Sequence, residues 1–232
     1  MHNHQFFVII SMVIDLKKYI FIILGIIVVL TIAVIVLVNN GKHEYLVYEY
    51  KTYNESGEIE NNTLEYYETK KVTNYVKIDT SKGIIMVELY PDVAPKTVSN
   101  FKSLVKNNFY KNMIFHRVIK DFMIQTGDPT GTGSGGSSRT IKGEFSSNGI
   151  ENNLSHTRGV VSMARSNAND SASSQFFIVQ KDSTYLDGNY AAFGNVIAGM
   201  EVVDKIATVM TDSNDKPISE IKLNSITFIN IK

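Results

Sequence analysis

The sequence predicts a mainly β fold, a closed antiparallel barrel with helical caps, preceded by one transmembrane helix. The barrel is predicted because many short apolar or alternating runs, each bounded by turn residues, follow one another from about residue 74. Two amphipathic helices, at 96–108 and 203–209, lie among these runs without the strand–helix alternation that is typical of a parallel sheet. The membrane helix is predicted from twenty almost wholly apolar residues at 19–38.

The predicted barrel begins with an antiparallel hairpin. Residues 75–80 alternate, turn at 81–83, and continue into a second alternating run that ends at residue 90. Pro95 suits the first turn of the helix that follows, whose apolar stripe we expect to pack against the core. Further strands are expected at 113–119, 122–127, 159–164, 175–180, 191–197 and 219–232.

Composition and motifs exclude several classes of function. The chain carries 23 basic and 23 acidic residues, so it lacks the basic surplus with which a general nucleic-acid binder neutralises phosphates. It has no cysteine, which removes disulfides, thiolate zinc sites, iron–sulfur clusters and cysteine nucleophiles. A glycine-rich stretch at 127–137 lacks the phosphate-loop pattern, so we expect a mobile surface loop there. We therefore expect no nucleic-acid partner, no metal and no cofactor.

The apolar segment determines the predicted location. As a helix, residues 19–38 would be about 30 Å long, the thickness of a bilayer core, and two lysines precede them. We expect an uncleaved signal-anchor at 19–40 after a short tail at 1–18. A cleaved signal peptide is the alternative, but the run is longer than a signal core and no small-x-small cleavage pattern follows it. The rest of the chain would then lie outside a cell membrane that the protein crosses once.

Residues 41–73 connect the predicted anchor to the predicted barrel. They contain seven glutamates and four lysines, and a turn signal at 54–57 separates two tyrosine-containing runs. A short hairpin and a solvated stalk both fit this pattern. We assign no chemistry to this segment.

A group of residues in the middle of the chain carries a family signature. Phe115-His116-Arg117-Val118-Ile119 is followed by Phe122-Met123, Gln125 and Gly127-Asp128. These residues resemble the signature of the cyclophilin family of peptidyl-prolyl cis–trans isomerases. Further similarity follows in the family's order at 93–101, 159–165, 173–178 and 185–206, so the resemblance covers about residues 76–232. It implies an eight-stranded antiparallel barrel capped by two helices, which we place at 74–232.

The chemistry of prolyl isomerisation can be stated from the amide bond itself. Rotation about an X-Pro bond is slow because it breaks amide resonance, over a barrier of roughly 18–20 kcal/mol. A catalyst needs no nucleophile, metal or proton transfer; it needs an apolar pocket for the proline ring and a donor that stabilises the twisted amide. Arginine suits the donor role because it stays charged and its planar fork can hold a carbonyl and approach the nitrogen together.

The resemblance implies one catalytic residue, Arg117, and ten substrate-binding residues: His116, Phe122, Met123, Gln125, Ala164, Arg165, Phe177, Tyr185, Leu186 and Tyr190. The walls of the proline pocket are implied to be Phe122, Met123, Phe177 and Leu186. Gln125 resembles the side chain that orients the arginine or the substrate backbone, and Ala164 is implied to offer backbone contacts to the residue before proline. We expect His116 to line the groove rather than act as a base, because rotation about an amide transfers no proton.

Three site positions depart from the common family pattern. Tyr185 and Tyr190 stand where many members have tryptophan and histidine, and both changes resemble bacterial-type members. Tyrosine keeps an aromatic wall with a polar tip. Arg165 occupies a groove position that is often asparagine, which favours acidic or extended substrates.

The sequence therefore predicts a membrane-anchored isomerase that acts on proline-containing segments of exported or surface proteins. The alternative is a cyclophilin-like module that binds such segments without turnover. The enzyme is favoured because a pure binder has no need of the cation Arg117 beside an apolar pocket. We expect the domain after the anchor to be monomeric.

Overall fold

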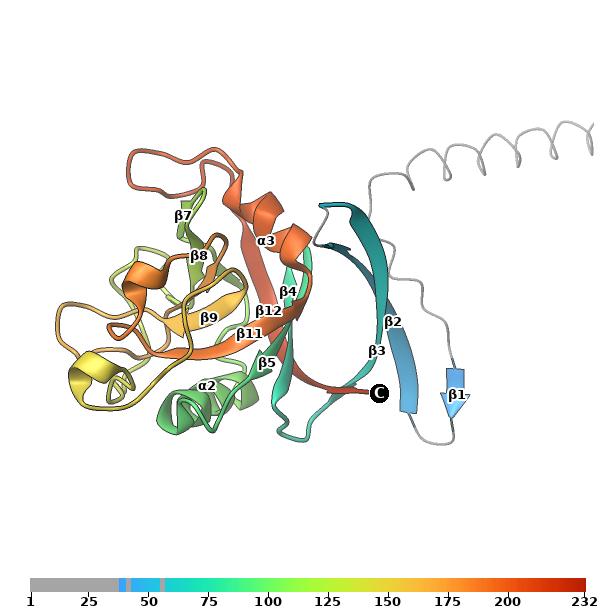
Figure 1. Ribbon diagram of the computed structural model, residues 1–232, viewed down its shortest axis with the longest axis horizontal. Coiled ribbons are helices and arrows are strands. Elements are labelled where there is room, and N and C mark those ends of the chain that lie inside the picture. Colours follow the sequence, from blue (N-terminus) through green and yellow to red (C-terminus); the bar gives the residue numbers. More distant parts are fainter. Residues whose placement is uncertain (1–37, 41–42, 55–56) are drawn as a thin grey trace, which may run out of the picture.

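A computed structural model describes residues 38–40, 43–54 and 57–232, which form one curled antiparallel sheet with two helices (Figure 1). The strands are β1 (Val38–Asn40), β2 (His43–Tyr53), β3 (Ile59–Thr69), β4 (Tyr75–Thr80), β5 (Gly83–Leu89), β6 (Met113–Ile114), β7 (Arg117–Ile119), β8 (Met123–Thr126), β9 (Val160–Met163), β10 (Phe176–Val179), β11 (Ala192–Ala198) and β12 (Lys222–Ile231). The helices are α2 (Pro95–Lys106) and α3 (Met200–Ala207), with short 3-10 turns at Ser146–Asn148 and Thr184–Leu186. The predicted mainly β fold with two helices is confirmed.

The main core lies inside the curled part of the sheet. Neighbouring strands follow the order β12-β4-β5-β11-β9-β10-β8-β7, and α2 and α3 lie at opposite ends of this part in Figure 1. The predicted apolar stripe of α2 is buried in the core through Val98, Phe101 and Val105. The Phe101 ring lies 5.4 Å from the ring of Phe176 and 5.3 Å from that of Phe193. These aromatic contacts join the helix to two strands of the sheet.

Strand β12 explains why the sheet curls without closing along its whole length. One edge of β12 pairs with β4 from Leu223 to Ile229. The other edge is divided, because residues 222–223 pair with β6 whereas residues 228–231 pair with β3. The prediction of a closed eight-stranded barrel is therefore corrected to a curled sheet of twelve strands within the described residues. At one end of that edge a two-residue ladder to β6, flanked by hydrogen bonds from Asn112 and Phe115, joins the sheet back to β12, and the hairpin takes the other end.

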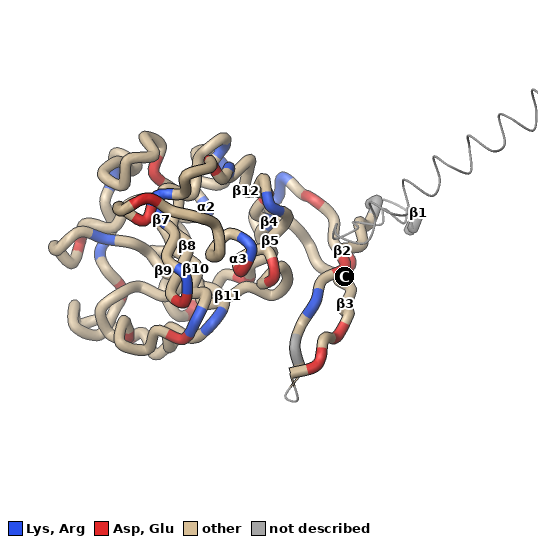
Figure 2. Tube along the Cα trace, turned by 90° about the horizontal axis from the view of Figure 1, so that it is seen from above, with Lys and Arg blue, Asp and Glu red and all other residues tan. Residues whose placement is uncertain are grey.

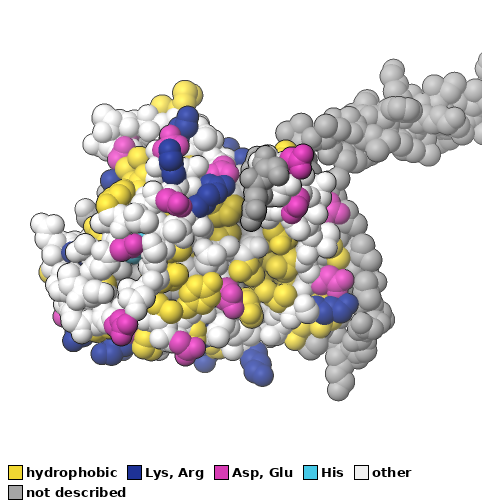
Figure 3. Space-filling model, in the orientation of Figure 1, with side chains coloured by type: hydrophobic (Ala, Val, Ile, Leu, Met, Phe, Trp, Pro, Cys, Tyr) yellow, Lys and Arg dark blue, Asp and Glu magenta, His cyan; other side chains and the backbone are white. Residues whose placement is uncertain are grey.

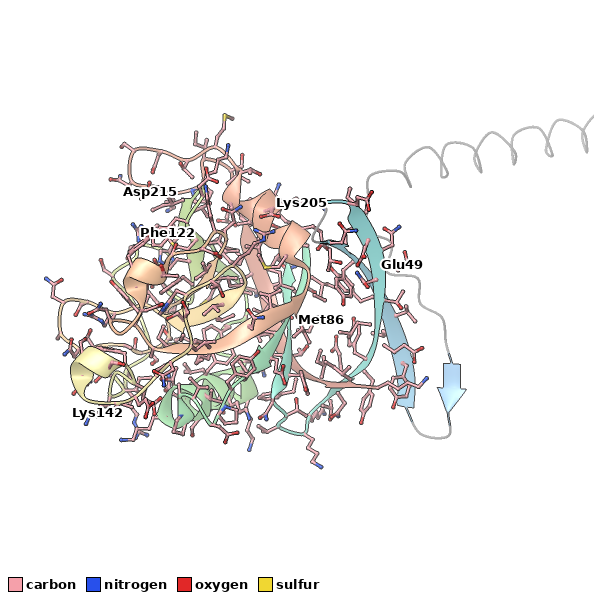
Figure 4. All side chains as sticks on the ribbon, viewed as in Figure 1. Glu49, Met86, Phe122, Lys142, Lys205 and Asp215 are labelled. Atoms are coloured by element: carbon pink, nitrogen blue, oxygen red, sulfur yellow. The ribbon has the colours of Figure 1, made fainter. Side chains whose placement is uncertain are left out.

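Of the two alternatives for the connector, the described residues form a hairpin. Strands β2 and β3 pair over eight residue pairs and curve over the outer face of the sheet (Figure 1). Between the hairpin and the sheet lies a second apolar cluster, in which the buried members are Tyr48, Tyr66, Met86, Ala198 and Ile229. Figure 4 shows Met86 in this space, and Figure 3 shows apolar side chains gathered on the same side of the molecule.

Tyr48 links the hairpin to the sheet and to α3. Its hydroxyl lies 2.8 Å from the carbonyl oxygen of Ile84 and 3.2 Å from a carboxylate oxygen of Glu201. Burial, with the Glu201 carboxylate beside it, raises the pKa of Tyr48 well above its usual value. The hydroxyl therefore keeps its proton and remains a hydrogen-bond donor at neutral pH.

The outward surface of the hairpin is acidic. Residues 43–69 contain seven glutamates and one lysine, and Figure 2 shows acidic positions along β3. Charged side chains on the outer strands of a sheet oppose pairing with strands of other molecules. The charge thus suits a hairpin that adds strands to the sheet and leaves a new edge exposed.

The predicted transmembrane helix at 19–40 lies outside the described residues except at its end. Residues 38–40 form β1, which pairs with β2. In the portion of the chain that the structure describes, no helix has both the length and the apolar character needed to cross a membrane. The predicted tail at 1–18 also lies outside the described residues.

The glycine-rich stretch at 127–137 is organised around the buried carboxylate of Asp128. Its oxygens accept hydrogen bonds of 2.7–3.1 Å from the backbone N–H groups of Thr130, Thr132, Gly133 and Gly135. Burial alone would raise the pKa of Asp128, but the hydrogen bonds from Thr130, Gly135 and Gly133 outweigh it and lower the pKa to about 2. The expectation of a mobile loop is therefore replaced by a hydrogen-bonded turn, in which glycine at 131 and 133 permits the positive φ angles.

Replacing Tyr48 with alanine should lower the free energy of unfolding by about 3 kcal/mol, because it removes a buried ring and leaves a cavity beneath the hairpin. Urea unfolding followed by circular dichroism measures the change. Glu49→Ala is the matched control, because Glu49 is the next residue of the same strand, is exposed and should change stability by less than about 0.5 kcal/mol. Equal stability of the two variants would show that the hairpin does not pack on the sheet.

Asp128→Asn should lower the free energy of unfolding at pH 7 by about 1–3 kcal/mol, because the backbone N–H groups of the turn lose a charged acceptor. The folded-state pKa lies below the unfolded value, so the carboxylate stabilises the fold above about pH 4. This contribution is lost as the pH falls towards about 2. Unfolding curves from pH 7 to pH 2 should therefore show a shallower acid loss in Asp128→Asn than in the native chain. Asp92→Asn, at an exposed carboxylate, should keep the native slope, and an unchanged slope in Asp128→Asn would contradict the assignment.

Candidate active site

The predicted site is built on one row of residues across neighbouring strands. Arg117 of β7 pairs with Gln125 of β8, which pairs with Phe177 of β10, which in turn pairs with Ser162 of β9. Residues directly opposite one another in a sheet point to the same face, so these side chains share a face. The residues that alternate with them, such as Val118, point to the other face and into the main core. The same strands therefore build both the core and the site.

An apolar cluster covers the site face of these strands. Its buried members are Met123, Val160, Phe177, Val179, Leu186 and Ala192, and the residues packed against it are Ile119, Phe122, Leu154, Ala164 and Tyr190. Six of the predicted substrate-binding residues are thus brought together. Tyr185 is different, because it is 69% exposed; its ring centroid lies 5.9 Å from that of Phe122.

His156 packs against two aromatic members of this apolar cluster. Its Nδ1 lies 2.8 Å from a carboxylate oxygen of Asp187, and its Nε2 lies 2.9 Å from the hydroxyl of Ser162. The imidazole stacks on the ring of Phe177 at 6.1 Å and meets the edge of Tyr190 at 6.5 Å. Burial lowers the pKa of His156, so the ring is neutral at pH 7. It fixes two aromatic walls of the site without being exposed itself.

Arg117 lies at the rim of the apolar cluster, and its side chain is 43% exposed. Its Nε donates a hydrogen bond of 3.4 Å to Asp215 Oδ2. Within the described residues, this is the guanidinium's one hydrogen-bonded partner, which leaves its terminal nitrogens available to a ligand. The arrangement places a permanent cation with free donors beside an apolar surface.

Gln125 contacts a second glutamine instead of Arg117. Its Nε2 donates to Gln175 Oε1 at 2.8 Å, and Gln175 Nε2 donates to the carbonyl oxygens of Gly133 and Gly135 at 2.9 and 2.7 Å. The loop that Asp128 organises therefore orients Gln125 through Gln175. The sequence analysis missed Gln175, and the available signal was its position directly before the apolar run at 176–179.

Arg165 and Ala164 border an open cleft of about 490 Å³ beside the two glutamines. The guanidinium of Arg165 lies over the rings of Tyr190 at 4.8 Å and Phe145 at 5.1 Å. Its Nε donates to the carbonyl oxygen of Asn189 at 2.9 Å. Among the described residues no carboxylate forms an ion pair with it, so its charge reaches the cleft without a local counter-ion. Ala164 donates its N–H to the carbonyl oxygen of Gln175 at 3.0 Å.

His116 is placed deeper than the sequence analysis expected. It is 5% exposed, and neither ring nitrogen has a hydrogen-bond partner in the described part of the chain. The ring lies beneath the glycine-rich turn, against Gly133. Burial lowers the pKa of His116, so it is neutral at pH 7.

Comparisons with known proteins agree with this geometry. The family model described as cyclophilin type peptidyl-prolyl cis-trans isomerase/CLD matches residues 75–228. Peptidyl-prolyl cis-trans isomerase-like 1 of Aspergillus fumigatus is 49% identical over 149 residues, which cover 64% of this chain and 91% of that protein. Peptidyl-prolyl cis-trans isomerase ppi1 of Schizosaccharomyces pombe is 46% identical over 149 residues, which cover 64% of this chain and 94% of that protein.

Solved structures show the same similarity to cyclophilin-type isomerases. A cyclophilin-type isomerase of Cryptosporidium parvum, solved in the presence of the dipeptide Ala-Pro, is similar with a TM-score of 0.62 and 38% sequence identity. The similarity covers 66% of this chain and 98% of that chain. The hairpin of β2 and β3 lies before the residues that the family model matches, so it is an addition to the family's domain.

These relatives correct the predicted location. A cell-membrane protein with its domain outside was expected, but the matched region makes up 91% and 94% of the two fungal isomerases, which leaves little room in them for an anchor and a stalk. The assignment to a bacterial-type member, made on Tyr185 and Tyr190, is likewise unsupported by these fungal relatives. The two tyrosines were too weak a basis for that finer assignment.

The matched segment contains the whole row from Arg117 to Phe177, the apolar cluster beside it and both helices. The relatives and the solved structures match a similar share of the chain, 64% and 66% in the examples above. The chain therefore belongs to the cyclophilin family and is a peptidyl-prolyl cis–trans isomerase.

Proposed function

We propose that Arg117 is the donor that stabilises the twisted X-Pro amide while the apolar cluster holds the proline ring. The observation that carries the proposal is the row across β7, β8 and β10, which places the guanidinium on the same face as Phe177. The terminal nitrogens are the part of Arg117 left to meet a substrate carbonyl, since Nε faces Asp215.

One cation and one apolar surface can together supply the transition-state stabilisation that the reaction requires. Uncatalysed isomerisation takes tens of seconds or longer, and bringing it to milliseconds requires about 5–6 kcal/mol of transition-state stabilisation. A single preorganised donor in a site that excludes water contributes roughly 2.7–4 kcal/mol. The remainder is assigned to the apolar cluster, which removes water from the amide and favours the twisted amide over the planar one.

The substrate is a proline-containing polypeptide in an extended conformation. The cleft beside Ala164 continues from the apolar cluster, so residues before the proline would lie along it. Main-chain contacts in such a groove give affinity with little sequence selectivity. Arg165 adds a positive charge at this end, which favours acidic side chains in the substrate.

Arg117→Ala should lower kcat/KM by roughly 100- to 1000-fold, because the twisted amide loses its charged donor. The measurement is turnover of an Ala-Pro-Phe-type peptide by the full chain. Arg117→Lys should fall between the native chain and the alanine variant, since lysine keeps the charge and loses the planar fork. Arg139→Ala removes an exposed arginine elsewhere and should leave turnover unchanged.

An inactive native chain that still binds the peptide would favour the binding module over the enzyme. An Arg117→Ala variant with native turnover and an unchanged melting temperature would instead remove Arg117 from the catalytic step.

Arg165→Gln should reduce the preference for acidic over basic residues before proline by a few-fold, because it removes the uncompensated charge at the cleft. The preference is the ratio of kcat/KM for two peptides that differ in that residue, and it should shrink as salt is raised. Lys205→Ala, on α3, removes a cation at an exposed position outside the cleft and should leave the ratio unchanged. Equal ratios in Arg165→Gln and the native chain would contradict this role.

A further inference from the structure

We propose that Asp215 is a positioning residue for Arg117, holding the Nε side of the guanidinium so that its terminal nitrogens face the substrate. The proposal rests on the proposed role of Arg117. Asp215 belongs to the loop after α3, outside the strands that carry the predicted site, and Figure 4 shows it on the same side of the molecule as Phe122. Arg117 Nε and Asp215 Oδ2 are 3.4 Å apart.

The loop that carries Asp215 is held rigidly against β7. The backbone N–H of Val118 donates to the Asp215 carbonyl oxygen at 2.8 Å, which fixes Asp215 beside the residue that follows Arg117. Residues 211 and 217 are joined by an antiparallel bridge. The Asp212 carboxylate accepts hydrogen bonds from the backbone N–H groups of Asn214 and Lys216 at 2.8 and 3.0 Å, so the loop is also stabilised by its own hydrogen bonds. The Asp215 carboxylate is thereby presented from a fixed backbone.

The backbone of Asp215 adopts a conformation that most residues avoid. Its φ angle is 61°, in the left-handed region, where aspartate is tolerated better than most residues and glycine carries no penalty. Glycine would thus suit the turn at least as well and would provide no carboxylate. A non-glycine residue held in this region is a reason to look for a function of its side chain.

Arg117 needs such an anchor because no other residue in the described chain holds its guanidinium. Gln125, its neighbour across the sheet, is committed to Gln175. A long side chain that is 43% exposed samples many rotamers, and a donor that is displaced by an ångström loses much of its effect on a transition state. An anchored Nε reduces this freedom and leaves the rest of the planar group to the amide.

The carboxylate also has an opposing effect, because it partly neutralises the charge of Arg117. Both side chains are 43% exposed, so water screens this effect strongly. Orientation depends instead on the hydrogen bond from Nε and on the fixed backbone of Asp215, and it acts on the geometry of the donor itself. We therefore expect the loss of Asp215 to slow catalysis rather than to accelerate it.

Asp215→Ala should lower kcat roughly fivefold with little change in KM, since a positioned donor acts mainly in the transition state. Asp215→Asn should stay within about twofold of the native chain, because the amide oxygen can accept the same hydrogen bond without the charge. Glu220→Ala is the matched control, because it removes an exposed carboxylate from the same segment, paired with Lys222. It should leave kcat unchanged.

A double-mutant cycle separates positioning from a structural role. In the Arg117→Ala background, Asp215→Ala should have no further effect on the residual kcat/KM, because the group that it positions is gone. A fivefold loss in both backgrounds, or a loss that Asp215→Asn does not rescue, would overturn the proposal. If Arg117→Ala itself keeps native turnover, the proposed role of Arg117 fails. If Arg117→Ala collapses turnover and Asp215→Ala keeps native kcat, the positioning role alone fails.

Discussion

The structure depends on strands β8, β9 and β10 being buried on both faces. Successive residues of a strand point to opposite faces, so each of these strands gives alternate residues to the main core and to the apolar cluster of the site. A shift of one residue in the register would place Phe177 in the core and its neighbour Ile178 in the site. The register that fills the core therefore also sets the relative positions of Arg117 and Phe177. The stability of the core and the geometry of the candidate site therefore share one constraint.

The second level of organisation comes from polar groups that are far apart in the sequence. Asp128 arranges the glycine-rich turn, the turn binds Gln175, and Gln175 orients Gln125. His156 fixes the aromatic wall from the opposite side through Asp187. Each of these groups is buried or hydrogen-bonded. The side chains that line the open cleft are therefore held in position by hydrogen bonds and packing on the side away from the cleft.

The sequence predicted the family's domain well because its signals are local. The alternating run at 75–80, the apolar stripe on 96–108 and the motif around Arg117 each depend on nearby residues, and the structure places all three in ordered elements of the domain. The hairpin of β2 and β3 was left open, because its pairing with β12 joins segments more than 150 residues apart. The sequence did not indicate Gln175 and Asp215 for the same reason, since each contacts a partner that only the folded chain brings close.

The hairpin shows how an addition can be made to this domain without disturbing its site. It pairs with the C-terminal end of β12 and covers Met86 on the outer face of β5, whereas the row from Arg117 to Phe177 lies on β7, β8 and β10. A polar link from the hairpin to α3 runs through the hydroxyl of Tyr48 to Glu201 at the start of the helix. The loop that carries Asp215 begins where that helix ends. Among the described elements α3 therefore connects the added hairpin to the loop that contacts Arg117, while that loop is held against β7 by its own hydrogen bond from Val118.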